Sequence, residues 1–332
     1  MICNLCPREC GAERTEYSGG GVCAMPTLPV VAKAMIHPWE EPCLTGKRTE
    51  ENQPIANQAI ENQGGADNGD ITGGAGAVFF SGCALRCVFC QNRRISRENF
   101  GKILSVERLR AVFRELIDRG AACLDLVTPS HFTPAVLEAL GEEQWPVPVV
   151  WNSGGYEKPE TIRLLEGRVQ VFLPDLKYAL PDPARKYSGA ADYFQWAAPA
   201  ILEMFRQTGP YRIKDGMLQS GVLIRHLILP GELENTRRVI DWIAATFHPG
   251  DVLFSLMSQY TPPAELLQTS AAAQSPVATR SPVWKNLSRR VTAAEYRAAV
   301  AYMENCGITE GYVQDRHSAR SAYTPVFDLD GI

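Results

Sequence analysis

Three cysteines in one short stretch, Cys83, Cys87 and Cys90, are the residues of this chain best suited to chemistry. They follow the apolar run 77–80, which predicts a buried strand that ends at Ser81-Gly82. Thiolates bind metals readily, so three thiols at the spacing C-x3-C-x2-C can converge on one metal centre. Iron–sulfur clusters usually take four cysteines, and a loop that supplies three leaves a position open, as catalytic metal sites do. A structural zinc loop with a distant fourth ligand is the alternative.

A second group of cysteines opens the chain, at the spacing C-x2-C-x3-C-x12-C. Its members are Cys3, Cys6, Cys10 and Cys23. Four thiols at this spacing predict a closed metal site, which would fold a segment too short and too polar to build its own core. The spacing fits either zinc or a second [4Fe–4S] cluster, and free or paired cysteines without metal are the alternative.

The segment 34–46 gathers a histidine, two glutamates and a cysteine between prolines. Because proline disfavours helix around it, we expect a loop laid over a pocket, where His37, Glu40 and Glu41 touch substrate. A solvated connector is the alternative. Cys43 receives no role.

Composition and charge narrow the class of protein. The chain has 332 residues, of which 45% are hydrophobic and 21% charged, as in ordinary globular proteins. A net charge of −4 without a basic cluster argues against a nucleic-acid partner, and no apolar run is long enough to span a membrane. The start of the chain lacks the features of a signal peptide, and the cysteines cluster at metal-like spacings. Both observations predict a protein of the reducing cytoplasm.

The changes in composition predict five parts. We expect a metal-binding lobe and loop (1–45), a flexible insertion rich in Asn, Gln, Glu and Gly (46–76), a catalytic domain (77–316), a second flexible insertion inside it (265–283) and a tail (317–332).

Strands and helices alternate from residue 77 onward. The expected strands are 77–80, 123–127, 147–151, 169–173, 221–229 and 252–257. Among the helices between and after them, one is capped by Ser105 and ends at Gly120, and the last opens with the capping box of Thr292 and Glu295. Such alternation predicts an α/β protein with a parallel sheet, best described as a partial (β/α)6 TIM-like barrel.

Polar residues follow five of these strands, at the places where a barrel of this kind carries its site. These strand ends are 128–131, 152–156, 174–178, 229–231 and 258–260. Because the carboxyl ends of parallel strands meet at one mouth, we expect these residues to form a ligand site beside the cysteine loop.

The cysteine loop, with Phe89 before its last cysteine, resembles the signature of the radical S-adenosylmethionine (SAM) superfamily. More closely, the motifs F-F-S-G-C-x-L-R-C-V-F-C-Q-N, L-V-T-P-S-H, D-L-K-Y, K-Y-S-G-A, R-H-L-I-L-P-G and L-M-S-Q-Y resemble its pyruvate formate-lyase activating enzyme-like group. The likeness covers essentially the whole chain outside the two insertions. It implies that Cys83, Cys87 and Cys90 hold a [4Fe–4S] cluster whose open iron binds SAM. It also implies a barrel of the radical SAM type and a flavodoxin- or ferredoxin-type electron donor.

The resemblance also implies roles for residues at the strand ends. Asp175 and Lys177 would contact SAM, with Lys177 facing its carboxylate. The other cofactor-side residues would be Phe89, Asn152, Ser153 and Gln259. The group's Gly-Gly-Glu, which holds the SAM amino group, is replaced here by 128–131, so His131, Thr128 or Asn152-Ser153 would substitute. His37, Glu41, His131 and Tyr156 are the substrate-side candidates for catalysis.

The expected reaction is reductive cleavage of SAM to a 5'-deoxyadenosyl radical that abstracts hydrogen. In one version the hydrogen comes from a glycine of a partner protein, which would make the chain a glycyl-radical enzyme activase. In the other it comes from a small molecule or peptide, with the N-terminal lobe and the segment 34–46 covering the mouth. A non-catalytic iron–sulfur or zinc protein that senses redox state is the alternative of another class.

Overall fold

The computed structural model describes residues 1–46, 52–54, 74–263, 286–315 and 325–332. The second predicted insertion lies wholly outside these residues, and the first lies largely outside them. Within these ranges, every helix is too short or too polar to cross a membrane.

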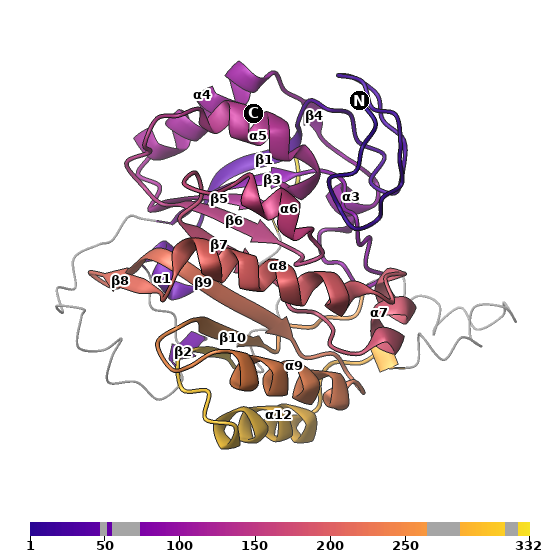
Figure 1. The fold of residues 1–332 in the computed structure, drawn as a ribbon, viewed down its shortest axis with the longest axis vertical. Coiled ribbons are helices and arrows are strands. Elements are labelled where there is room, and N and C mark those ends of the chain that lie inside the picture. The colour runs from indigo at the N-terminus through magenta and orange to yellow at the C-terminus, as the bar shows by residue number, and fades with distance from the viewer. Residues whose placement is uncertain (47–51, 55–73, 264–285, 316–324) are drawn as a thin grey trace, which may run out of the picture.

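One large sheet organises the molecule (Figure 1). Its strands in chain order are β1 Val30–His37, β2 Asn52–Pro54, β3 Ala75–Phe80, β4 Lys102–Ile103, β5 Cys123–Val127, β6 Val149–Ser153, β7 Val171–Pro174, β8 Arg212–Lys214, β9 Met217–Leu227, β10 Leu253–Met257 and β11 Gly311–Gln314. The order across the sheet is β2-β11-β10-β9-β7-β6-β5-β3-β1-β4, and β8 pairs with β9 at the side. The two ends of this order are different strands, so the sheet is open.

Neighbouring strands from β3 through β5, β6, β7, β9 and β10 to β11 run parallel. The predicted α/β fold with a largely parallel sheet is therefore confirmed. The seventh parallel strand, β11, was not predicted. It is only four residues long, and its first residue, Gly311, lies so close to the Phe254 backbone that a side chain there would collide.

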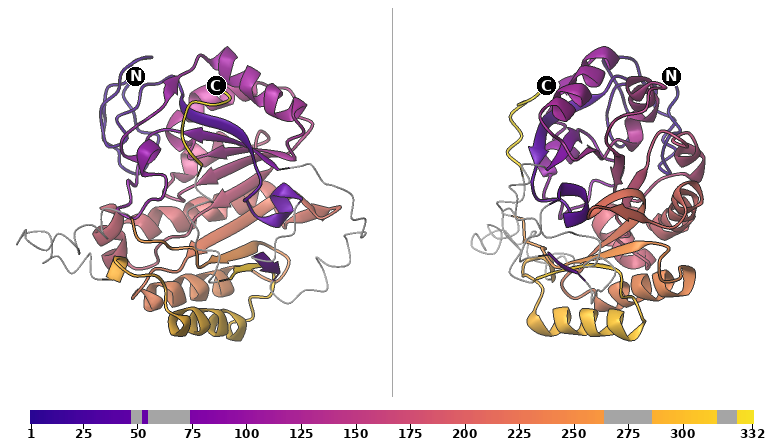
Figure 2. Two further views of the ribbon diagram at one scale, coloured as in Figure 1. Left: turned by 180° about the vertical axis from the view of Figure 1, so that it is seen from behind. Right: turned by 90° about the vertical axis from the view of Figure 1, so that its left-hand side faces the viewer.

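The helices that connect these strands are α1 Pro42–Thr45, α3 Arg93–Ser96, α4 Val106–Asp118, the 3₁₀ turn η1 Ser130–Phe132, α5 Thr133–Leu140, α6 Pro159–Arg163, α7 Pro181–Ser188, α8 Tyr193–Thr208, α9 Leu233–Thr246 and α12 Ala293–Asn305. The long helices α4, α5, α8, α9 and α12 cover one side of the sheet, and the short helix α1 packs on the other (Figures 1 and 2).

Local sequence explains where two of these helices begin. The Ser105 side chain accepts the Arg108 N–H at the start of α4, and Thr292 and Glu295 form the capping box of α12. Both predicted caps are confirmed. The helix α5 begins at Thr133, which has helical torsion angles, and Phe132 is its cap residue.

The predicted division between lobe and barrel is wrong in one respect. Residues 30–37, which we assigned to the N-terminal lobe, form β1 and pair antiparallel with β3 inside the main sheet. The prediction of a loop over 34–46 is also wrong, since β1 runs to His37 and α1 follows. Pro42 is the first residue of α1, where a helix needs no N–H donor and tolerates proline.

Candidate functional site

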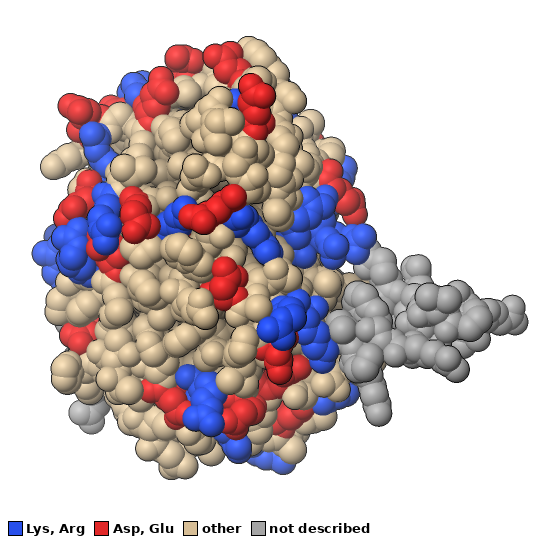
Figure 3. Space-filling view, turned by 45° about the vertical axis from the view of Figure 1, so that its right-hand side comes forward, with Lys and Arg blue, Asp and Glu red and all other residues tan. Residues whose placement is uncertain are grey.

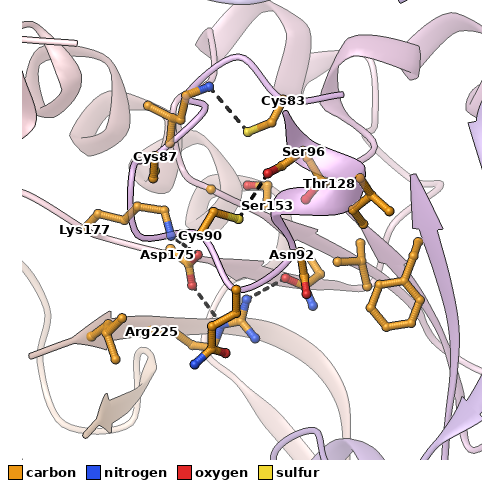
Figure 4. Close-up of a pocket in the computed structure, with 18 of the residues that line it drawn as sticks. Cys83, Cys87, Cys90, Asn92, Ser96, Thr128, Ser153, Asp175, Lys177 and Arg225 are labelled. Carbon is orange, nitrogen blue, oxygen red and sulfur yellow. Dashed lines mark hydrogen bonds and ion pairs between the residues drawn. The ribbon is translucent and has the colours of Figure 1, made fainter. Parts of the chain in front are cut away.

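The cysteine loop lies beyond the carboxyl end of β3 and forms one wall of a cavity of about 250 Å³ (Figure 4). The three thiols face the same space, and each sulfur accepts a hydrogen bond from the protein. The donors are the Leu85 N–H to Cys83 (3.4 Å), the Ser188 hydroxyl to Cys87 (3.0 Å) and the Ser96 hydroxyl to Cys90 (3.3 Å). Hydrogen bonds to sulfur stabilise the thiolate form and orient metal-binding groups.

Burial disfavours the thiolate form of Cys87 and Cys90, as it does for other buried cysteines of the chain. Burial raises the pKa of Cys87 to about 12 against the opposing charge of Lys177, and burial also raises the pKa of Cys90. A bound metal overcomes such a cost, because it takes the thiol in its deprotonated form. In the parts of the chain that are described, no three His, Cys, Asp or Glu side chains are placed to share a single ion. A [4Fe–4S] cluster gives each thiolate its own iron, so its ligands need not meet at one point.

An ion-pair chain runs from the cysteine loop into the cavity. Lys177 bonds Asp175 just after β7, and the Arg225 guanidinium on β9 bonds the same carboxylate at 3.0 Å. Burial acts to raise the pKa of Asp175, but the two cations outweigh it and the pKa is lowered, so Asp175 is ionised at neutral pH. Arg225 also donates to the Asn152 amide oxygen at 2.6 Å and to Glu40 at 3.3 Å. One arginine thus joins three strand ends and the N-terminal segment.

The polar end of β6 is fixed by hydrogen bonds to the buried carboxylate of Glu157. Glu157 accepts hydrogen bonds from the side chains of Trp151 (2.9 Å), Ser130 and Ser153. Beside it, Thr128 has a left-handed backbone (φ 62°), which is strained for a β-branched residue, and its N–H donates to the Asn152 carbonyl at 2.7 Å. Strain of this kind marks positions where the fold fixes a site.

Residues from the N-terminal segment line the inner end of the cavity. His37, Trp39, Glu40 and Glu41 all contribute to the lining. Burial lowers the pKa of His37 to about 4, so its ring is neutral at pH 7. The predicted placement of His37 and Glu41 at a pocket therefore agrees with the structure, although the segment is a strand end and a helix start.

All six predicted cofactor-side residues line the cavity. They are Phe89, Asn152, Ser153, Asp175, Lys177 and Gln259. Two of the predicted catalytic residues do not line it. His131 is buried against Phe132, and its ring bonds the Ser81 carbonyl at 2.7 Å. The Tyr156 hydroxyl donates to Asp192 at 2.9 Å and the ring stacks on Tyr193. Both side chains support the site from behind, so their assignment as substrate-side groups does not fit the structure.

The four N-terminal cysteines lie near one another. Burial raises the pKa of Cys6 to about 11, and the nearby thiols of Cys23, Cys3 and Cys10 raise it further. Cys3, Cys6 and Cys23 are buried and Cys10 is exposed. Among the residues described, no three of these thiols are placed to share a single ion, so the second metal site stays a prediction.

Arg8, which lies between Cys6 and Cys10 in the sequence, connects the N-terminal lobe to the loop of Cys83, Cys87 and Cys90. Its guanidinium donates to the carbonyls of Ala84 (2.8 Å), Ser188 (2.7 Å) and Gly189. Ala84 follows Cys83 in the chain, and the Ser188 hydroxyl bonds the Cys87 sulfur. The lobe therefore contacts two segments that position the thiols of Cys83 and Cys87.

Two charged residues that were not predicted belong to this region: Arg225 lines the cavity, and Asp125 is buried behind it, where it accepts a hydrogen bond from the Asn152 amide at 3.3 Å. Each is a single charged residue inside a run otherwise expected to be a buried strand, Gly221–Leu229 and Cys123–Val127 respectively. Because a charge is buried in a strand only when it has a partner or a function, that pattern could have identified both.

Comparison with known proteins finds a distant relative whose name assigns no function. The chain is 29% identical over 195 residues to "Uncharacterized protein MJ0674" of Methanocaldococcus jannaschii, a match that covers 56% of this chain and 53% of that protein. The chain thus spans about half the length of this relative. No protein-family model matches the chain.

Proposed function

We propose that the chain is a radical SAM enzyme with an open barrel of the radical SAM type. The observation that carries the proposal is the arrangement of Cys83, Cys87 and Cys90. They lie on one loop at the carboxyl end of a parallel strand, each with its own hydrogen-bond donor, and they share a cavity with Asp175 and Lys177. Three ligands leave one iron of a [4Fe–4S] cluster open for SAM.

The cluster and SAM, when bound, supply one-electron cleavage to a 5'-deoxyadenosyl radical that abstracts hydrogen. The protein's own residues bind and orient. Cys83, Cys87 and Cys90 hold the cluster, and Lys177 presents its ammonium to the SAM carboxylate. Asp175 and Arg225 fix Lys177 through their ion pairs, and the buried cavity walls exclude water from the reacting groups. Cys3, Cys6, Cys10 and Cys23 would hold zinc or a second [4Fe–4S] cluster.

The source of the hydrogen defines two versions of this activity. A glycine of a partner protein would make the chain a glycyl-radical enzyme activase, and a small molecule or peptide would make it a metabolic or modifying enzyme. Either version needs an electron donor of flavodoxin or ferredoxin type. The N-terminal residues that line the inner end of the cavity favour an enclosed substrate.

The test is anaerobic reconstitution with iron and sulfide, reduction by dithionite and addition of SAM. We expect 5'-deoxyadenosine from the wild type and from Cys306→Ala, a cysteine near the end of α12, but none from Cys87→Ala. Roughly eight irons per chain rather than four would place a second cluster in the N-terminal lobe. Fully loaded, reduced protein that forms no 5'-deoxyadenosine under any condition would favour a non-catalytic metal protein.

A further inference from the structure

The inner end of the cavity, together with Asp125 buried behind its wall, holds more buried acid than base. Four carboxyl groups and two cations interact there, namely Glu40, Glu41, Asp125 and Asp175 with Arg225 and Lys177. Both cations bond Asp175, and Arg225 makes one further bond to Glu40. Among the described residues, Glu41 and Asp125 form no ion pair with a cation. On the face drawn in Figure 3, by contrast, acidic and basic side chains are interspersed.

Leaving these carboxyls buried without a counter-charge is costly, because an ion loses its hydration without gaining a partner. Burial is the main cause of a pKa of about 7 for Glu41 and of a pKa well above the usual range for Asp125. The charge of Glu40 raises both values further. A positively charged group at this place would reverse the cost.

Four buried atoms in this region also lack a hydrogen-bond partner of good geometry in the described part of the chain. They are His37 Nδ1, Glu41 Oε2, Asp125 Oδ1 and the Ser255 hydroxyl, which neighbours Glu41. His37 lines the cavity and is only 6% exposed. Its Nε2 lies 4.0 Å from Glu40 Oε1, beyond hydrogen-bond distance, and the neutral ring offers one N–H donor and one acceptor nitrogen. Buried polar atoms are rarely left unsatisfied. A ligand that brings positive charge and N–H donors would favour the ionised form of the carboxyls and would satisfy their oxygens.

We propose that the inner end of the cavity binds a cationic nitrogen, the ammonium or amidinium group of a small substrate. The inference rests on the proposed function, because it names the class of molecule that gives up hydrogen. An ammonium group brings three N–H donors and the missing positive charge. The backbone of a glycine residue brings no charge, so this site favours the small-molecule version of the activity over the activase.

SAM carries an ammonium group as well, but the position of the site argues against it as the occupant. His37 pairs with Ala75 at the first residue of β3, whereas Cys83 follows Phe80, its last residue. His37 and the two glutamates that follow it thus enter the cavity from the end opposite the cysteine loop, whereas Asp175 lies beside Lys177 on the side where the open iron would hold the amino and carboxylate groups of SAM.

To test this inference, a metabolite extract of the source cells is separated by size and by ion exchange at pH 7. The fractions are small molecules retained by a cation exchanger, small molecules retained by an anion exchanger, unretained small molecules and macromolecules. Each fraction, and SAM alone, is added to cluster-loaded protein. Two readouts are taken, 5'-deoxyadenosine after reduction with SAM present, and the unfolding temperature without reductant.

We expect the cation-exchanger fraction alone to raise 5'-deoxyadenosine formation and to raise the unfolding temperature by about 2 °C or more. Glu41→Gln should weaken both effects by at least about tenfold in the concentration needed, because a buried charge partner is lost. Glu304→Gln, an exposed residue of α12, is the matched control and should behave as wild type.

Each other outcome is decisive. If another fraction stimulates, or SAM alone gives the Glu41-dependent shift, or no fraction has an effect, the cationic-substrate inference is overturned. If the cation-exchanger fraction gives the Glu41-dependent thermal shift but no 5'-deoxyadenosine forms, the binding site stands and the proposed function fails.

Discussion

Replacing Glu41 by glutamine should make the protein more stable at pH 8 than the wild type. Glu41 is buried beside Glu40, Asp125 and Arg225, and its pKa is raised from 4.5 to about 7, mainly by burial. A carboxyl whose folded-state pKa is raised stabilises the fold fully below the unfolded value, and this contribution is lost as pH rises through the folded value. Glutamine keeps the shape of the side chain and has no charge to lose its hydration.

The size of the effect follows from the two pKa values. Each pH unit between 4.5 and about 7 is worth about 1.4 kcal/mol, so the wild type loses about 3 kcal/mol of stability between these values that Glu41→Gln does not lose. The two proteins should therefore converge near pH 5 and separate progressively up to pH 8.

The assay is urea denaturation of cluster-loaded protein under anaerobic conditions at pH 5, 6, 7 and 8. The slope of stability against urea should be unchanged, so that the difference appears in the midpoint. Glu304→Gln, on the exposed face of α12, controls for the loss of a carboxylate in general. A Glu41→Gln protein that is less stable than wild type at pH 8, or whose difference from wild type is independent of pH, would refute the reasoning.

Three further predictions test the site. Arg225→Met should cost about 3–5 kcal/mol of stability at pH 7, because it leaves carboxylates buried without their shared cation, and less at pH 5, where they take up protons; a pH-independent loss in urea denaturation would contradict this. Lys177→Met should weaken SAM binding in equilibrium dialysis by about tenfold to a hundredfold, whereas the exposed Lys214→Met should not, and equal affinities would remove Lys177 from the site. Arg8→Gln should speed the loss of iron from the loop of Cys83, Cys87 and Cys90 to a chelator, because the lobe then no longer holds this loop. Arg110→Gln, which also removes hydrogen bonds to backbone carbonyls, is the control. Equal rates for the two variants would show that the Arg8 contact does not position the thiols.

Periodicity and turn residues were enough to predict the six strands from β3 to β10 in the parallel series and most of the helices between them. The failures have physical causes. The sequence places β1 in the lobe because Val30–His37 shows no alternation of polar and apolar residues that would distinguish a strand from a connecting segment. These residues are buried only because they pair with β3. Pro42 was taken to forbid a helix, although it occupies the first turn, where proline is tolerated.

The cavity lining at the strand ends could be predicted because parallel strands bring their carboxyl ends together. What the sequence could not reveal is which polar residue faces inward at such an end. His131 and Tyr156 follow strands just as Asn152 does, but their side chains turn back to bond Ser81 and Asp192. Arg225 lies inside a strand, where its charge in an apolar run marks it as unusual. Only the fold shows that Asp175 and Glu40 are its partners.

The most direct test of the central proposal is the electron paramagnetic resonance spectrum of the reconstituted, dithionite-reduced protein, recorded before and after SAM is added. If Cys83, Cys87 and Cys90 hold a cluster with an open iron, the reduced [4Fe–4S] signal will change on addition of SAM, and Cys87→Ala will lack that response while Cys306→Ala retains it. A fully loaded wild type whose signal does not change with SAM would contradict the assignment of this loop as a SAM-binding cluster site.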